Sequence, residues 1–365
     1  SSRIQRTWPS TTCTRNGERW WITWSNPNAR TGCVHAPASA SPLPLGTHEP
    51  FSPLGERFGR GEEDGTIAEM NLAYSSNAYM RFPVDDAIDR IARLGYRGIE
   101  LMADVPHLWP PSTSDSDVAR IRGRIRDAGL AISNVNAFMM NAVQDFWHPS
   151  WIEPDEACRR RRIRHTIDAL RMASGLGAPS ITTEPGGPLP DGMSREQAMD
   201  LFVAGLYESL CVAEDVGVML LVEPEPELLI ENAEQFLDLA RRIDSPRFGL
   251  NFDVGHFFCV GEPLPETIHR LRAFTRHYHL EDIAATRVHQ HLIPGRGAID
   301  FAAVLQAIRA ADYDGWLTVE LYPYLDDPDA AGRQARDHLL RLGTRPPDAS
   351  PASASRPITD EDRPL

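Results

Sequence analysis

The chain has 365 residues, of which 42% are hydrophobic and 24% are charged, a composition typical of a globular protein with a large buried core. The formal net charge of −14 argues against a nucleic-acid or anionic-membrane partner, because phosphate binding needs a basic surface. No run of 18 apolar residues predicts a membrane-spanning helix, and the N-terminus lacks the order of a secretory signal. We therefore expect a cytoplasmic protein.

The five cysteines form no CxxC pair, and their number is odd. This pattern predicts neither a zinc knuckle nor a disulfide framework. We expect reduced thiols.

The two ends of the chain differ from its middle. Residues 1–69 mix several tryptophans with Ser, Thr, Pro and Arg and show no period of 2 or 3.6 residues, so we expect an irregular N-terminal extension. Met70 then opens a clear apolar strand, and one hypothesis is that Met70 is the natural start, with upstream translated sequence before it. Residues 344–365 are rich in Pro, Ser, Ala and Asp and predict a disordered tail.

Between residues 70 and 343, short apolar runs alternate with helical patterns, as in βα units that build a parallel sheet. The length is close to the roughly 250 residues of one (β/α)₈ barrel. A doubly wound open sheet is the alternative, but it normally carries a glycine-rich phosphate loop after an early strand, and none is present. We predict an α/β fold, a single-domain (β/α)₈ TIM barrel. Its strands are expected at 71–76, 98–103, 131–137, 180–184, 218–225, 248–255, 276–282 and 316–323.

The segments between these strands have helical features. In the helix expected after residue 83, the apolar residues fall on one face: Val84, Ala87, Ile88, Ile91 and Leu94. Several helical patterns end in a glycine that can adopt the left-handed cap conformation: Gly95, Gly129, Gly177 and Gly217.

Polar residues end each of the last four predicted strands. Active sites of these barrels lie at the carboxyl ends of the strands, and a charge buried there is costly unless it is paired or bound to a metal. One such residue could be a salt bridge or a helix cap, but four in register predict a shared divalent cation. The four predicted ligands are Glu223, Asp253, His279 and Glu320.

Three carboxylates and one imidazole form an oxygen-rich ligand set. Mn²⁺ suits it best, and Mg²⁺, Co²⁺ and Zn²⁺ are alternatives. Two ligand carboxylates on opposite sides of a bound sugar could also carry a proton, one removing it next to a carbonyl and the other returning it. The metal would stabilise the enediolate oxygens as charge develops.

Five motifs then occur in order: VEP at 222–224, FDVGH at 252–256, HLED at 279–282, GRGAID at 295–300 and TVEL at 318–321. With them the chain from Met70 to about Leu342 resembles the xylose isomerase-like TIM-barrel superfamily, in the sugar phosphate isomerase/epimerase family that includes D-tagatose 3-epimerase, hydroxypyruvate isomerase and inosose dehydratase. The resemblance implies that the four residues bind metal and that Glu223 and Glu320 exchange the proton. It also implies that His256 contacts a small carbohydrate substrate. A homo-oligomer is compatible with it, since such relatives are often dimers or tetramers.

Some assignments have alternatives. Glu225 lies two residues beyond Glu223 on the same strand face and could be the ligand instead. His277 shares a face with His279, and a local hydrogen bond is its plainer interpretation. His256 could satisfy a backbone carbonyl rather than contact substrate.

Loop residues supply further candidate substrate contacts. His107 and Trp109 follow the second strand, Glu184 follows the fourth, and Arg296 follows the seventh, where barrels often bind phosphate. The ordinary alternatives are surface packing for the first two, helix capping for Glu184 and solvent exposure for Arg296. The basic run at 159–164 is expected to be a solvated helix face paired with the acids at 153–156, rather than a nucleic-acid contact.

The leading functional hypothesis is a divalent-metal-dependent isomerase or epimerase of a sugar or sugar-like polyol. A dehydratase or lyase acting on a keto-inositol or 3-keto sugar would use the same proton abstraction and then expel a leaving group. A non-catalytic ligand-binding barrel is the alternative outside enzymology. Proton exchange from solvent without elimination would separate the first two.

Overall fold

A computed structural model describes residues 11–15, 18–22 and 71–343. The hypothesis about Met70 and the tail predicted at 344–365 lie outside these residues. The chain divides into two units, and the first contains an antiparallel pair of strands, β1 (Thr11–Arg15) and β2 (Glu18–Ile22). The extension predicted to be irregular therefore contains regular structure, because a strand this short can form without an alternating pattern of apolar residues.

The second unit is built on a closed barrel of eight parallel strands. Each strand pairs with the next along the chain, and the last pairs with the first, where Leu317 lies opposite Leu72. The prediction of a (β/α)₈ barrel is confirmed. Its strands are β3 (Leu72–Ser75), β4 (Gly98–Met102), β5 (Ala131–Asn136), β6 (Ser180–Thr183), β7 (Met219–Val222), β8 (Phe248–Asp253), β9 (Thr275–Leu280) and β10 (Leu317–Val319).

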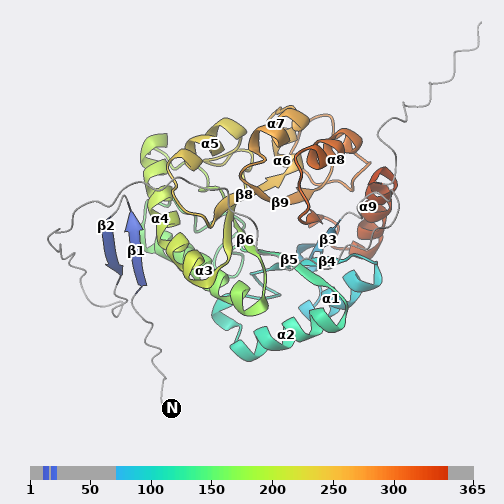
Figure 1. The fold of residues 1–365 in the computed structure, drawn as a ribbon, viewed down its shortest axis with the longest axis horizontal. Coiled ribbons are helices and arrows are strands. Elements are labelled where there is room, and N and C mark those ends of the chain that lie inside the picture. The colour runs from blue at the N-terminus through green and yellow to red at the C-terminus, as the bar shows by residue number, and fades with distance from the viewer. Residues whose placement is uncertain (1–10, 16–17, 23–70, 344–365) are drawn as a thin grey trace, which may run out of the picture. The chain divides into compact units, whose positions relative to one another are not determined.

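Helices follow the strands and surround the barrel (Figure 1). The α-helices are α1 (Val84–Arg93), α2 (Asp115–Asp127), α3 (Glu156–Leu176), α4 (Arg195–Val216), α5 (Ala233–Arg241), α6 (Val254–Cys259), α7 (Leu264–Leu271), α8 (Phe301–Ala310) and α9 (Pro328–Gly343). Short 3₁₀ turns, η1 (Ser76–Tyr79) and η2 (Pro110–Ser112), follow β3 and β4. The last helix, α9, contacts both α8 and α1 and so completes the ring.

The local predictions that define the barrel hold. The apolar face predicted for α1 is buried against the barrel, and the four predicted cap glycines all adopt positive φ angles between 74° and 81°. All eight predicted strands extend beyond the observed carboxyl ends, most of all β7, which ends at Val222, and β10, which ends at Val319. Glu223 and Glu320 therefore stand immediately after their strands, at the mouth of the barrel.

The basic run at the start of α3 is not a uniformly solvated face. Arg162 is fully buried, and its guanidinium donates hydrogen bonds to the backbone carbonyls of Pro149 (2.8 Å) and Phe138 (2.7 Å). Arg160 pairs with Glu208 of α4 (2.6 Å) rather than with the acids at 153–156. The prediction is wrong for these residues because helix packing, which the run of identical charges does not reveal, decides which arginine faces inward.

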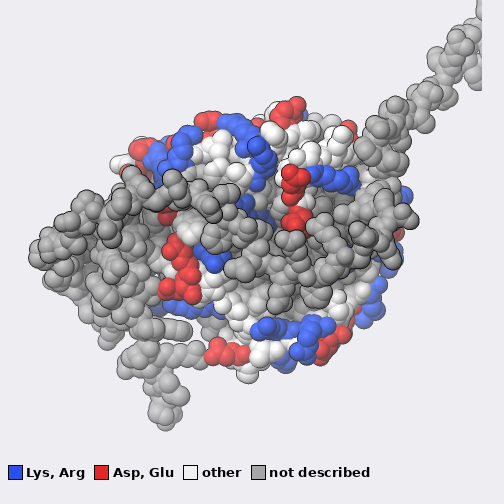
Figure 2. All heavy atoms as spheres, in the orientation of Figure 1, with Lys and Arg blue, Asp and Glu red and all other residues white. Residues whose placement is uncertain are grey.

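The surface is mixed in charge on the face that Figure 2 shows, where basic and acidic side chains are interspersed over the barrel. Within the described ranges, every helix is too short or too polar to cross a bilayer. Cys158 and Cys259 are free thiols, as expected. Cys211 is disulfide-bonded, so the expectation of reduced thiols is wrong for this residue; spacing along the chain does not reveal such a pairing.

Candidate active site

The structure brings together the four side chains that the sequence analysis proposed as metal ligands. One donor atom from each lies within 4.8 Å of the others, and all four side chains are buried. The barrel explains the convergence, because each residue stands at or just beyond the carboxyl end of one of four neighbouring strands. These residues are Glu223 after β7, Asp253 at the end of β8, His279 near the end of β9 and Glu320 after β10.

The His279 ring lies at the centre of this cluster. Its Nδ1 is 2.8 Å from Glu223 Oε1, 3.6 Å from Glu320 Oε2 and 3.8 Å from Asp253 Oδ2. Its Nε2, on the other side of the ring, is 2.8 Å from Glu100 Oε2. One edge of the imidazole therefore faces three carboxylates, and the opposite edge faces a fourth.

The cluster carries an excess of negative charge in a buried place. Burial by itself lowers the pKa of His279, but the carboxylates of Glu100, Glu223 and Glu320 outweigh it and raise that pKa well above its ordinary value. Burial and the neighbouring Glu223 raise the pKa of Glu320 well above its ordinary value, although His279 opposes the shift. Asp253 Oδ2 is buried and has no hydrogen-bond partner among the described residues. A divalent cation bound by these side chains would balance the charge and satisfy that oxygen.

Glu320 is oriented by two amides. Asn77 Nδ2 and Asn136 Nδ2 donate hydrogen bonds to its Oε1, at 2.8 Å and 3.1 Å. Oε2 remains directed towards His279 and His291, each with Nδ1 at 3.6 Å. One oxygen is thus fixed by the protein, while the other faces the centre of the site.

The geometry distinguishes Glu223 and His279 from the two alternative ligands, Glu225 and His277. Glu225 lies outside the four-residue cluster, where its Oε1 accepts a hydrogen bond from Trp147 Nε1 (3.3 Å). Burial and Glu223 raise the pKa of Glu225 well above its ordinary value. His277 faces Glu100 at 3.5 Å rather than the three carboxylates of the cluster. Glu223 and His279 are therefore better placed than Glu225 and His277.

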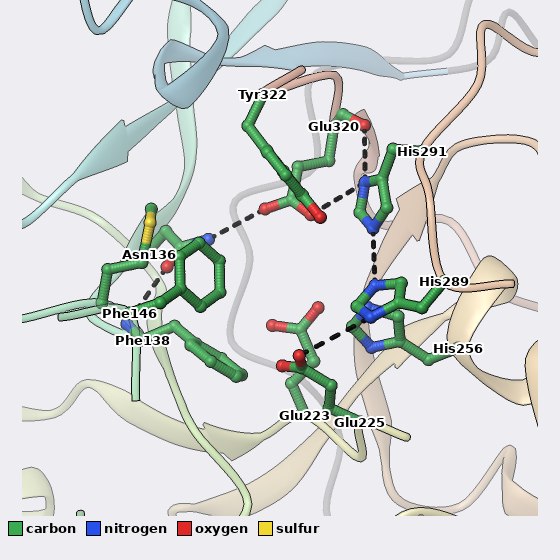
Figure 3. Close-up of a pocket in the computed structure, with 11 residues that line it drawn as sticks. Asn136, Phe138, Phe146, Glu223, Glu225, His256, His289, His291, Glu320 and Tyr322 are labelled. Atoms are coloured by element: carbon green, nitrogen blue, oxygen red, sulfur yellow. Dashed lines mark hydrogen bonds and ion pairs between the residues drawn. The ribbon is translucent and has the colours of Figure 1, made fainter. Parts of the chain in front are cut away.

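A small cavity opens beside the cluster. Figure 3 shows Phe138, Phe146 and Asn136 on one side of it and three histidines on the opposite side, with the carboxylates between them. The aromatic rings of Phe146 and Tyr322 lie 5.8 Å apart and form a continuous apolar wall with Phe138. One wall is thus apolar and the other is rich in hydrogen-bonding groups.

Of the five substrate contacts proposed from the sequence, His256 lines this cavity. The other four are not among the side chains that line it in the described part of the chain. Both ring nitrogens of His107 lie against polar atoms of Ser76, Tyr79 and Phe82, and the Trp109 ring stacks on His165, 5.1 Å away.

The remaining two also have other partners. Glu184 is fully buried, 3.7 Å from Arg162, and accepts a hydrogen bond from the Trp151 backbone N–H. Arg296 is exposed and donates to Gln334 of α9. These four side chains are therefore occupied by packing or by protein partners.

Several residues of the site were not predicted. Glu100 lies within the apolar strand β4, so the sequence pattern predicts a core position for it. A charged residue inside a buried strand is costly unless it is paired, and this could have indicated a functional role. His289 and His291 lie in the loop that follows β9, in the sequence VHQHL, where two closely spaced histidines before the GRGAID motif could have indicated them. Tyr322 lies two residues beyond Glu320 and lines the cavity.

Comparison with known proteins agrees with this architecture. Residues 88–342 match the family model described as xylose isomerase-like TIM barrel. The chain is 25% identical over 277 residues to fructoselysine 3-epimerase of Escherichia coli O157:H7, covering 72% of this chain and 95% of the relative. It is 22% identical over 275 residues to inosose dehydratase of Clostridium perfringens (strain 13 / Type A), covering 70% and 88%.

Solved structures share the fold. A D-tagatose 3-epimerase-like protein superimposes with a TM-score of 0.64 at 22% identity, covering 75% of this chain and 98% of that one. The IOLI protein, described with a binding zinc atom, superimposes with a TM-score of 0.63 at 18% identity, also covering 75% and 98%.

Proposed function

We propose, from the premise that the chain belongs to the xylose isomerase-like TIM barrel family, that it is a divalent-metal-dependent isomerase or epimerase of a sugar or sugar-like polyol. The observation that carries this proposal is the convergence of three carboxylates and one imidazole at the mouth of the barrel, beside a cavity. The fructoselysine 3-epimerase relative supports the same reaction class.

The donor atoms fit a divalent cation held by Glu223, Asp253, His279 and Glu320. Oxygen ligands with a single nitrogen favour Mn²⁺, with Mg²⁺, Co²⁺ and Zn²⁺ as alternatives. When bound, the cation supplies Lewis-acid stabilisation of the negative charge that develops on a substrate oxygen. Glu100 accepts the hydrogen of His279 Nε2 and so holds the ring with Nδ1 towards the three carboxylates.

Glu223 and Glu320 are the proposed proton carriers. Both line the cavity, and in Figure 3 they project into it from different sides. A carboxylate on one face of a substrate carbon can remove the proton next to a carbonyl, and a carboxyl group on the other face can return it. Asn77 and Asn136 fix one oxygen of Glu320, so that only Oε2 is free to move a proton.

The walls of the cavity favour a carbohydrate-like substrate. A sugar ring has an apolar C–H face that can pack on Phe138 and Phe146, and hydroxyl groups that can bond to the opposite wall. We propose that His256 contacts the substrate from that opposite wall. Its Nδ1 is held by the Pro224 carbonyl at 2.9 Å, and its Nε2 lies 3.7 Å from Asp253 Oδ2 of the carboxylate cluster.

The test is a solvent-exchange screen with metal-loaded full-length protein in D₂O, using ketoses, keto-inositols and 3-keto glycosides as substrates. We expect deuterium to enter a carbon next to a carbonyl, without loss of water, and NMR to detect it. Glu320→Gln should slow the exchange about 10²–10⁴-fold, the usual contribution of a positioned acid or base. Glu208→Gln, which changes a surface ion pair with Arg160, is the matched control and should exchange at the wild-type rate.

Two other outcomes would redirect the proposal. Exchange accompanied by elimination would indicate a dehydratase or lyase, for which the inosose dehydratase relative is the supporting comparison. Complete absence of exchange, together with unchanged ligand affinity in Glu320→Gln, would indicate a non-catalytic binding barrel and would refute the proposal.

A further inference from the structure

The Trp147 side chain is partly exposed at the end of the barrel that contains the candidate site. It is 37% exposed, and among the described residues the other exposed large apolar side chains are Val105, Val143, Leu189 and Val288. All of them lie in loops that follow the carboxyl ends of strands. Single exposed apolar residues are usually scattered over a surface, whereas these gather around the mouth of the barrel.

Two contacts join Trp147 to the cavity. Its indole Nε1 donates a hydrogen bond to Glu225 Oε1, at 3.3 Å, and Glu225 lines the cavity. Its ring also meets the edge of the Phe146 ring, with the centroids 6.1 Å apart and the planes at 76°. Phe146 belongs with Phe138 to the apolar wall of the cavity (Figure 3). The apolar wall therefore continues outward from Phe138 through Phe146 to Trp147.

The protein holds Trp147 in one orientation. Its backbone N–H donates to Asp145 Oδ1 at 3.0 Å, and the Arg162 guanidinium donates to its carbonyl at 3.4 Å. With the bond to Glu225, these contacts anchor both the main chain and the side chain. The ordinary alternative is a solvated surface residue, which needs none of these anchors. A rigid aromatic ring loses little conformational entropy on binding, and tryptophan is therefore common where ligands bind.

We propose that Trp147 and Phe146 form an outer subsite that binds an apolar or aromatic substituent attached to the sugar-like substrate. This inference rests on the proposed function, because the cavity would hold the sugar while the substituent extends past Phe146 to the mouth. An aromatic substituent would stack on the indole or meet its edge, the two arrangements that aromatic pairs prefer. The substrate is then a sugar with an apolar or aromatic group attached, rather than a free monosaccharide.

The experiment compares matched glycosides by isothermal titration calorimetry with Mn²⁺-loaded, full-length protein. The ligands are the phenyl and methyl β-glycosides of D-glucose, D-galactose and D-mannose, so that the members of each pair differ only in the substituent. These glycosides have no carbonyl group, so the titration measures binding without turnover. We expect the phenyl member of at least one pair to bind the wild type about tenfold more tightly, since the aromatic contact and the apolar area that it buries both contribute.

Variants assign this preference to the outer subsite. Trp147→Ala should bind the phenyl and methyl members of that pair equally, while its affinity for the methyl member stays at the wild-type value. Trp147→Phe keeps an aromatic ring and should retain part of the preference, and thermal melting checks that both variants fold. Leu189→Ala removes an exposed apolar side chain from the loop after β6. It is the matched control and should keep the full preference.

Three results would overturn the proposal. The first is a wild type that binds the phenyl and methyl members of every pair equally or binds neither, and the second is a preference that persists in Trp147→Ala. The third is a wild-type dimer that becomes a monomer in Trp147→Ala by sedimentation velocity, because a second copy of the chain would then cover the indole. None of these measurements depends on turnover. They therefore separate failure of the outer subsite from failure of the proposed isomerase activity, which the solvent-exchange screen tests.

Discussion

Glu100 and His279 form a buried pair inside the barrel, with Oε2 of the carboxylate 2.8 Å from Nε2 of the imidazole. Asn134 Nδ2 donates a hydrogen bond to the same carboxylate oxygen at 2.8 Å. The carboxylate is thus held in place from strand β5 and in turn orients a ring on strand β9. Such an outer partner fixes the tautomer of a metal ligand and raises its basicity.

Replacing this partner should weaken metal binding. We expect Glu100→Gln to lower the affinity of the carboxylate-rich site about 10–100-fold, the usual cost of losing an outer-shell partner. Competition between the protein and a chelator for Mn²⁺ measures this directly. Glu262→Gln, which alters a carboxylate that accepts hydrogen bonds from Ala233 and Thr267, is the control. Equal affinities in the two variants would mean that Glu100 has no role in orienting the ligand.

The four proposed ligands could be found from the sequence because each interrupts an apolar run at the point where a barrel strand ends. Glu100 could not be assigned in the same way. It lies in the middle of β4, and its approach to His279 depends on closure of the barrel, which brings together residues 179 positions apart. The eight strands, in contrast, each carry a local pattern that does not depend on closure.

The cavity walls were harder to predict for a related reason. Phe138 and Phe146 belong to the long segment between β5 and α3, which has no repeating pattern of apolar residues. His289 and His291 also lie in an irregular loop. Side chains in such segments are positioned by contacts from elsewhere in the chain, and those contacts are not visible as a period.

Arg162 makes contacts of this kind with the segment between β5 and α3. Its guanidinium donates to the carbonyls of Pro149 and Phe138 and lies within 3.4 Å of those of Ala137 and Trp147. It therefore holds together the segment that carries the aromatic wall.

A lysine cannot reproduce this contact, since it offers a compact charge rather than a planar fork of donors. We expect Arg162→Lys to lower the free energy of unfolding by about 3 kcal/mol, because buried carbonyls lose their donors. Urea denaturation measures the change. Arg161→Lys, at the exposed neighbouring position, should change the free energy of unfolding by less than about 0.5 kcal/mol. Equal effects would show that Arg162 contributes no more than a surface charge.

Glu184 should make stability depend on pH. Burial raises its pKa from 4.5 to about 7, although Arg162 and the Trp151 N–H oppose the shift. Because the pKa of Glu184 is higher in the folded state than in the unfolded state, its contribution to the free energy of unfolding is fully present below about pH 4.5. This contribution is lost as the pH rises through 7. The loss approaches about 3 kcal/mol for a shift of this size.

The comparison that isolates this effect is wild type against Glu184→Gln, by urea denaturation at pH 5 and pH 8. The neutral amide does not titrate, so the stability of the wild type relative to the variant should fall between these pH values. A difference that stays constant, or that grows as the pH rises, would contradict the raised pKa.

Two glycines of the segment between β6 and α4 separate backbone strain from steric contact. Gly187 and Gly192 both have positive φ angles, +92° and +78°. A Cβ on Gly187 would lie 2.3 Å from Ser150 Cβ, whereas a Cβ on Gly192 would have no atom within 4 Å. We expect Gly192→Ala to lower the free energy of unfolding by about 1–2 kcal/mol from backbone strain alone. Gly187→Ala should lower the free energy of unfolding by about 1–3 kcal/mol more than Gly192→Ala does, since Ser150 must also move. Urea denaturation of both variants measures this difference. Equal decreases in the free energy of unfolding would mean that the segment beside Glu184 shifts to accommodate the Cβ without an energetic penalty.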